Sequence, residues 1–297
     1  MNAELINQKA MSLLSNLDFE GAELILQENA HQNPSYQTYN NLGWFLISVG
    51  GGSESRNPFK KGLRYLIISN KKKHSTLNFY ALAQAIELQM NLKLKYKTVD
   101  CKKAYNYLKK VTGFNDSYQH DYNLLRYEYL INPLDTSHIA SAEVLFENFQ
   151  ISETAELYLE IVGKNISKNG LKFIELYKNF LDDASIFIYF TRVGEYLRAY
   201  NMIDDVLNKY SFDKIIAASI IECCIKTKHF EEARKYIDLI GKDNYESSYK
   251  ISNRTLMKLL RDETFRNNTI SKYVYVPSML YQCCFFGCPE HMTGWFF

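Results

Sequence analysis

The stretch Gln37–Ser69, QTYNNLGWFLISVGGGSESRNPFKKGLRYLIIS, decides the fold of this chain. Its apolar residues recur at a spacing near 3.6 on both sides of a Gly/Ser segment, which is typical of two amphipathic helices. The first helix is expected to end near Val49 and the second to begin near Pro58. We therefore predict a helical hairpin with an exposed loop over Gly50–Arg56. The apolar positions are Tyr39, Leu42, Leu46, Ile47, Phe59, Leu63, Leu66 and Ile67.

Each arm of this hairpin carries one glycine on its packing face. Gly43 lies in the first arm and Gly62 lies in the second. A residue without a side chain allows two helices to approach closely. The sequence therefore predicts a close helix contact at both positions.

Similar hairpins recur on both sides of this stretch. They are expected over Met1–Pro34, over Thr76–Val111 with a polar loop at Lys93–Asp100, and over Asp213–Lys242. The turn around Asp18, with sequence DFEGA, is echoed two hundred residues later by HFEEA starting at His229. Repetition of one supersecondary unit predicts a stacked helical array.

The rest of the chain is expected to be helical up to a C-terminal tail without helical periodicity. The tail begins near Tyr273 and ends in GWFF. Few prolines and glycines favour helices throughout the remainder, so the predicted fold class is all-α. Further helices are expected over 122–130, 140–149, 153–162, 170–181, 185–207 and 252–265.

Two stretches resemble a known repeat family. The pattern Leu42-Gly43, Gly51, Lys61-Gly62, Tyr65 resembles a Sel-like repeat, a relative of the tetratricopeptide repeat. The stretch from Leu82-Ala83 through Asp100 and Lys103-Ala104 to Tyr107-Leu108 follows the same pattern, and the first hairpin, with Ala10, Ala22 and Pro34, is similar to a 34-residue tetratricopeptide unit. The resemblance implies a right-handed α-solenoid of antiparallel hairpins over residues 1–268, followed by a Cys-rich aromatic tail over 269–297.

The same resemblance implies a concave groove, lined by the first helix of each hairpin, that binds a protein or peptide. Amides there would bond a partner's backbone, and an aromatic residue would cover its apolar side chains. Asn40 as plain surface and Trp44 as core packing remain alternatives. The basic clamp that some relatives use is poorly matched, because Leu77 and Ala81 stand where Lys or Arg is expected. The implied groove residues are Asn7, Met11, Asn40, Asn41, Trp44, Tyr80, Gln84 and Glu87.

The tail holds the densest group of metal-binding side chains. Cys283, Cys284, Cys288 and His291 fall within nine residues and are candidate ligands for zinc or copper. Adjacent cysteines are not the usual CxxC pattern, so a buried apolar cap and a redox-modified tail are the alternatives. In a docking alternative, Trp295 and the two phenylalanines that follow it fill a pocket.

The net charge of +2 hides a strongly basic segment. Residues 56–110 contain fourteen Lys or Arg but only Glu87 and Asp100, a local net charge of +12. Such a segment can attract an anionic partner, although a solvated helix face with flexible lysine-rich loops is the preferred explanation. It lacks interleaved aromatic residues and any named motif, so nucleic-acid binding is not expected.

Several classes of function find no support in the sequence. No Walker loop, GxSxG, HExxH or EF-hand motif occurs, so no enzyme is expected. The amino-terminal stretch does not read as a secretory signal and no stretch could span a membrane, so a cytoplasmic protein with six reduced cysteines is expected. Cys223 and Cys224 are predicted to pack in a helical core.

The sequence leaves three hypotheses for function. The first is a scaffold or adaptor that binds a protein or peptide partner in the groove. The second is a metal-binding or cysteine-modified protein whose array presents the tail. The third is an immunity-type protein that neutralises a toxin by covering its surface.

Overall fold

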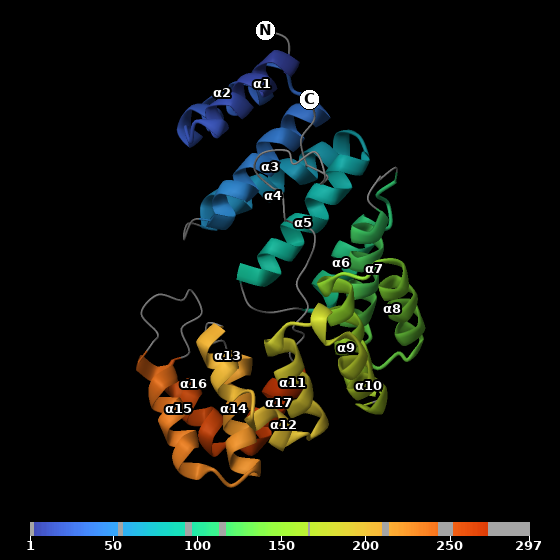
Figure 1. Ribbon diagram of the computed structural model, residues 1–297. Helices are drawn as coiled ribbons and strands as arrows, with labels where there is room; N and C mark the ends of the chain where they lie inside the picture. The colour runs from blue at the N-terminus through green and yellow to red at the C-terminus, as the bar shows by residue number, and fades with distance from the viewer. Residues whose placement is uncertain are drawn as a thin grey trace. The chain divides into compact units, whose positions relative to one another are not determined.

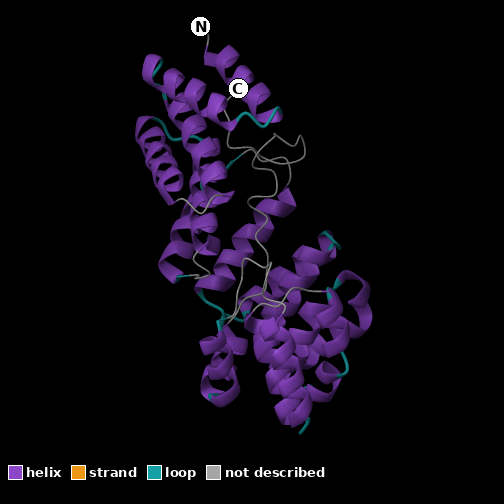
Figure 2. Ribbon diagram, turned by 90° about the vertical axis from the view of Figure 1, so that its left-hand side faces the viewer, coloured by secondary structure: helices purple, strands orange, loops and turns teal. Residues whose placement is uncertain are grey.

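The computed structural model describes residues 3–52, 56–92, 97–112, 117–165, 167–209, 214–242 and 252–272. All regular structure in these ranges is helical, and no strand occurs among them (Figure 2). The predicted all-α class is therefore confirmed. None of the helices described is both long and apolar enough to cross a membrane.

The described residues form two compact units, which divide between Pro133 and Leu134. The sequence had indicated one array over 1–268. In the first unit the helices pack in chain order, so that each contacts its neighbours (Figure 1). Its helices are α1 (Ala3–Ser15), α2 (Phe19–Gln32), α3 (Tyr36–Gly52), α4 (Arg56–Lys72), α5 (Thr76–Leu92), α6 (Thr98–Leu108) and α7 (Ser117–Ile131).

The α3/α4 hairpin has the most extensive contacts of any helix pair described. Its helices are longer than predicted, since α3 runs through all three glycines of Gly50–Gly52 and α4 begins at Arg56. Glycine is a weak helix former, but backbone hydrogen bonds and packing override that preference. Gly43 and Gly62 lie against each other in the contact, as predicted.

The second unit is built around two apolar helices, α11 and α14, which pack against each other and against several neighbours (Figure 1). Nearly all of α14 is buried, including Cys223 and Cys224, which confirms their predicted place in the core. The helices of this unit are α8 (Ser137–Asn148), α9 (Ser152–Asn165), α10 (Ser167–Tyr177), the 3-10 turn η1 (Lys178–Phe180), α11 (Asp183–Val193), α12 (Tyr196–Tyr200), α13 (Ile203–Lys209), α14 (Lys214–Lys226), α15 (Phe230–Lys242), α16 (Asn253–Arg261) and α17 (Glu263–Lys272).

Two helices predicted as continuous are broken. The segment 185–207 divides after α11, because Gly194 adopts a left-handed conformation with φ of 83° that ends the helix. The segment 252–265 divides at Asp262, whose carboxylate accepts the backbone N–H of Phe265 and starts α17. Since α17 continues to Lys272 and buries Ile270, a domain boundary after residue 268 would cut a helix.

The predicted echo between the turns near Asp18 and His229 extends to their backbone geometry. Leu17 and Lys228 both have positive φ, 61° and 65°. The following N–H groups reach back five residues in each case, from Asp18 to the Leu13 carbonyl (2.9 Å) and from His229 to the Cys224 carbonyl (2.8 Å). The α1/α2 and α14/α15 hairpins therefore turn by the same hydrogen-bonded motif.

Candidate functional site

The predicted groove residues lie on three helices of the first unit: Asn7 on α1, Asn40, Asn41 and Trp44 on α3, and Tyr80 and Gln84 on α5. All six are buried, and none is more than 6% exposed. The structure therefore places them in the interior of the chain and not on an open surface. Trp44 and Tyr80 belong to two hydrophobic clusters, which agrees with the core-packing alternative for Trp44.

Buried polar side chains continue from these residues along α5 and α7. Asn78 donates one hydrogen bond to Oδ1 of Asn40 (3.0 Å) and another to the carbonyl of Leu66 (3.1 Å). One amide thereby joins α5 to both α3 and α4. We call the buried polar residues of the first helices the inner polar layer. Its members are Asn7, Asn40, Asn41, Asn78, Gln84, Glu87, Gln119, Asn123 and Arg126.

The inner polar layer contains a buried ion pair. The guanidinium of Arg126 on α7 donates to both carboxylate oxygens of Glu87 on α5, at 3.0 and 3.2 Å. The hydroxyl of Tyr127 also donates to Glu87. Burial raises the pKa of Tyr127 well above its usual value, and the Glu87 charge adds to the shift. The phenol therefore stays protonated as a donor, and the pair ties α5 to α7.

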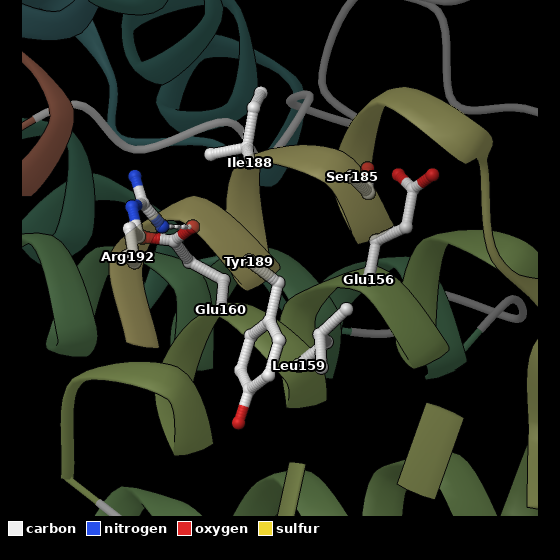
Figure 3. Close-up of a pocket in the computed structure, with 7 residues that line it drawn as sticks. All are labelled: Glu156, Leu159, Glu160, Ser185, Ile188, Tyr189 and Arg192. Carbon is white, nitrogen blue, oxygen red and sulfur yellow. Dashed lines mark hydrogen bonds and ion pairs between the residues drawn. The ribbon is translucent and has the colours of Figure 1, made fainter. Parts of the chain in front are cut away.

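A cleft in the second unit lies between α9 and α11 (Figure 3). On one side Arg192 pairs with Glu160 and donates from Nε to the carbonyl of Ile270 (2.9 Å), so both charges are engaged. The lining residues are Glu156, Leu159, Glu160, Ser185, Ile188, Tyr189 and Arg192.

Glu156 is a carboxyl of this cleft that stands apart from the ion pair (Figure 3). Burial, together with the nearby Asp182 carboxylate, raises the pKa of its carboxyl to about 7. The Ser185 hydroxyl acts in the opposite direction. The cleft thus holds a carboxyl that exchanges a proton near neutral pH, and its described lining residues include no histidine or cysteine.

The predicted metal ligands Cys283, Cys284, Cys288 and His291 lie outside the described residues, as does Trp295. Within the described ranges, no three His, Cys, Asp or Glu side chains come together as a metal site would require.

The cysteines that the structure describes, Cys101, Cys223 and Cys224, are buried free thiols. Burial raises the pKa of Cys101 to about 11 and of the other two to about 12. Neutral, enclosed thiols of this kind are inert packing groups.

Sequence reasoning passed over Arg126, Glu156 and Arg192. Arg192 interrupts the apolar run of α11, and that interruption is the available signal. The helices α7 and α9 carry several charges each, so Arg126 and Glu156 do not stand out in the sequence. The sequence does not show which carboxylate pairs with each arginine, because Glu87 precedes Arg126 by 39 residues and Glu160 precedes Arg192 by 32. Spacing along one helix cannot reveal such pairs.

Comparison with known proteins adds no assignment. No family model, curated protein or solved structure matches this chain.

Proposed function

We propose that this chain is a protein-interaction scaffold, a right-handed α-solenoid of tetratricopeptide- and Sel-like hairpins that binds an extended segment of a protein partner along α1, α3, α5 and α7. The inner polar layer is the observation that supports this proposal. Burying amides and charges is costly unless they are hydrogen-bonded, so an array built only for packing would carry apolar residues there. Four successive first helices carry polar ones instead.

The chemistry of the layer suits a peptide backbone. Asparagine and glutamine offer both donors and acceptors, which match the N–H and C=O groups of an extended chain. Trp44 and Tyr80 lie beside the amides and would contact apolar side chains of the partner. The proposal includes no catalytic activity and no bound cofactor.

Burial adds a condition to this proposal. Because Asn41 and Gln84 are at most 3% exposed within the chain itself, a partner that reaches them must displace whatever part of the chain covers them. The apparent affinity is then lower than the intrinsic one by the fraction of molecules in the open form.

Photo-crosslinking from aromatic positions tests the proposed surface. A benzoylphenylalanine at Trp44 or Tyr80 of the full chain replaces one aromatic side chain by another. The control position is Phe230 on α15 of the second unit, which is 57% exposed. We expect crosslinks to an extended segment of a partner protein from Trp44 and Tyr80 but not from Phe230. Crosslinks only within the chain, or equal yields at Phe230, would refute binding on this face.

A further inference from the structure

Lysines at the end of α4 lie over aromatic rings of α3. The Lys73 ammonium is 4.8 Å from the centre of the Tyr36 ring, and its Nζ lies 3.4 Å from that residue's hydroxyl. The Lys72 ammonium is 5.4 Å from the centre of the Tyr39 ring. The Tyr39 ring in turn stacks on Tyr65 with centroids 6.0 Å apart. These distances are within the range of cation–π contacts.

The same arrangement occurs where α5 begins and α6 ends. The Lys110 ammonium lies 5.3 Å from the centre of the Phe79 ring. That ring stacks on Tyr107 at 6.2 Å and on His74 at 5.6 Å. Because His74 directly follows Lys73, the contacts around Tyr36 and those around Phe79 form one continuous surface.

We call this surface the lysine–aromatic edge. Its four lysines are exposed, and none lies within ion-pair distance of a carboxylate in the described part of the chain. The two acidic residues of segment 56–110 are engaged elsewhere, Glu87 with Arg126 in the interior and Asp100 with Lys103. Within the ranges that the structure describes, no carboxylate therefore neutralises the positive charge of the edge. Its members are Tyr36, Tyr39, Tyr65, Lys71, Lys72, Lys73, His74, Phe79, Tyr107 and Lys110.

Helix capping explains only part of this pattern. Lys71 and Lys72 lie in the last turn of α4, where a cation interacts favourably with the helix dipole. Lys73 and Lys110 lie beyond the ends of α4 and α6 and contact rings from the preceding helix of each hairpin. The alternation of ammonium groups and rings across helices needs a different explanation.

We propose that the lysine–aromatic edge binds single-stranded nucleic acid, with the lysines holding phosphates and the tyrosine rings stacking on bases. Lysine is a compact point charge that binds phosphate without requiring a fixed bidentate geometry. Aromatic rings stack on unpaired bases of any sequence. Phosphates would draw the ammonium groups off the rings and leave the ring faces to the bases.

The interleaving was absent from the sequence because the rings and lysines come from different helices. Tyr36 and Lys73 are 37 residues apart. Only the packing of the hairpins brings such residues together, which is why the order of residues along segment 56–110 gave no reason to expect nucleic acid. The edge is also separate from the inner polar layer, so this inference does not depend on the proposed scaffold function.

Fluorescence anisotropy of the full-length protein with a labelled 20-nucleotide oligouridylate tests the proposal. We expect micromolar binding at low salt, and a plot of log K against log salt concentration with a slope of about −3, since four lysines each contribute about −0.7. The variant K72Q/K73Q/K110Q should bind at least tenfold more weakly with a shallower slope. The control K168Q/K172Q/K178Q removes three exposed lysines of the second unit and should stay within about twofold of the unaltered protein.

The aromatic contribution separates nucleic acid from an acidic protein segment. Tyr36→Leu should weaken oligouridylate binding about fivefold or more, and Tyr36→Phe, which keeps the ring, should restore it. A labelled 20-residue polyglutamate serves as the acidic peptide and should bind more weakly than the RNA. The proposal is overturned if oligouridylate does not bind at low salt, if the control variant loses as much affinity, or if polyglutamate binds as tightly.

Discussion

Gly43 and Gly62 face each other across α3 and α4 at backbone contact. A β-carbon on Gly43 would lie 2.9 Å from the carbonyl oxygen of Gly62, and one on Gly62 would lie 2.7 Å from the carbonyl oxygen of Gly43. Real β-carbons do not approach backbone atoms this closely, so any side chain at either position must push the two helices apart.

Gly43→Ala is therefore expected to destabilise the protein even though alanine is the better helix former. Overpacking should lower the free energy of unfolding by about 1–3 kcal/mol, measured by thermal or urea denaturation. Gly21→Ala is the comparison, because the atoms nearest to the added carbon there belong to the carboxylate of Asp18 and not to a backbone. That carboxylate caps α2 by accepting the Gly21 N–H, so its displacement should cost about 1 kcal/mol. Unchanged stability of Gly43→Ala would show that α3 and α4 separate without cost.

Breaking the Glu87–Arg126 pair should be costly. Arg126→Met leaves a carboxylate buried without its cation, and we expect a loss of about 3–5 kcal/mol in the free energy of unfolding. Replacing both charges, as in E87L/R126M, should recover part of this loss, because no isolated charge then remains. If the double variant lost as much unfolding free energy as Glu87→Leu and Arg126→Met lose in sum, the two residues would not be coupled.

Glu156 should make stability depend on pH. The pKa of its carboxyl is about 7 in the folded protein, above the ordinary value of 4.5, so the folded state keeps the proton longer than the unfolded state. The resulting stabilisation is fully present below about pH 4.5 and is lost as pH rises through 7. We expect Glu156→Gln to raise the unfolding free energy at pH 8 by on the order of 2 kcal/mol and to change it little at pH 5.

The control for this experiment is Glu147→Gln, which makes the same chemical change at an exposed position on α8. Its stability relative to the unaltered protein should not vary between pH 5 and pH 8. A pH-independent difference for Glu156→Gln would mean that its carboxyl ionises normally.

The left-handed turn residues offer a stabilising substitution. Lys228 has φ of 65°, a conformation that is costly for any residue with a β-carbon. Lys228→Gly should raise the free energy of unfolding by about 0.5–1 kcal/mol, and Gly194→Ala should lower it by at least as much. Calorimetric melting temperatures that move in the same direction for both variants would contradict this geometry.

The tail carries a prediction that rests on sequence alone. If Cys283, Cys284, Cys288 and His291 bind zinc or copper, purified protein should retain close to one equivalent of metal at pH 7.5 and lose it as the thiols are protonated at lower pH. Elemental analysis should compare the unaltered protein with a variant in which the three tail cysteines are replaced by serine. Metal that persists in that variant would not come from the tail.

The spacing of apolar residues and the residue types in the turns were enough to predict the hairpins, because each of these signals is contained in a short stretch of sequence. A close helix contact at each of Gly43 and Gly62 was predictable in the same way, because each glycine lies on the packing face of its own helix. The break at Gly194 was not predictable. A glycine inside an apolar run can either continue a helix or end it, and tertiary packing determines which occurs. The split at Asp262 likewise depends on a side chain that either faces solvent or caps a new helix.

The site-level features were less predictable because they join distant parts of the chain. Glu87 and Arg126, and Tyr36 and Lys73, are brought together only by packing between helices. The residues expected to line an open groove were correctly placed on first helices, but their burial depends on contacts that no local pattern encodes.

Buried carboxylate–guanidinium pairs occur in both units, Glu87–Arg126 between α5 and α7 and Glu222–Arg266 between α14 and α17. In each pair the two charges belong to different hairpins. Removing or duplicating one of these hairpins alone would leave an unmatched charge in the interior. A hairpin that carries one of these charges can therefore be lost or duplicated without that cost only together with the element that carries the opposite charge.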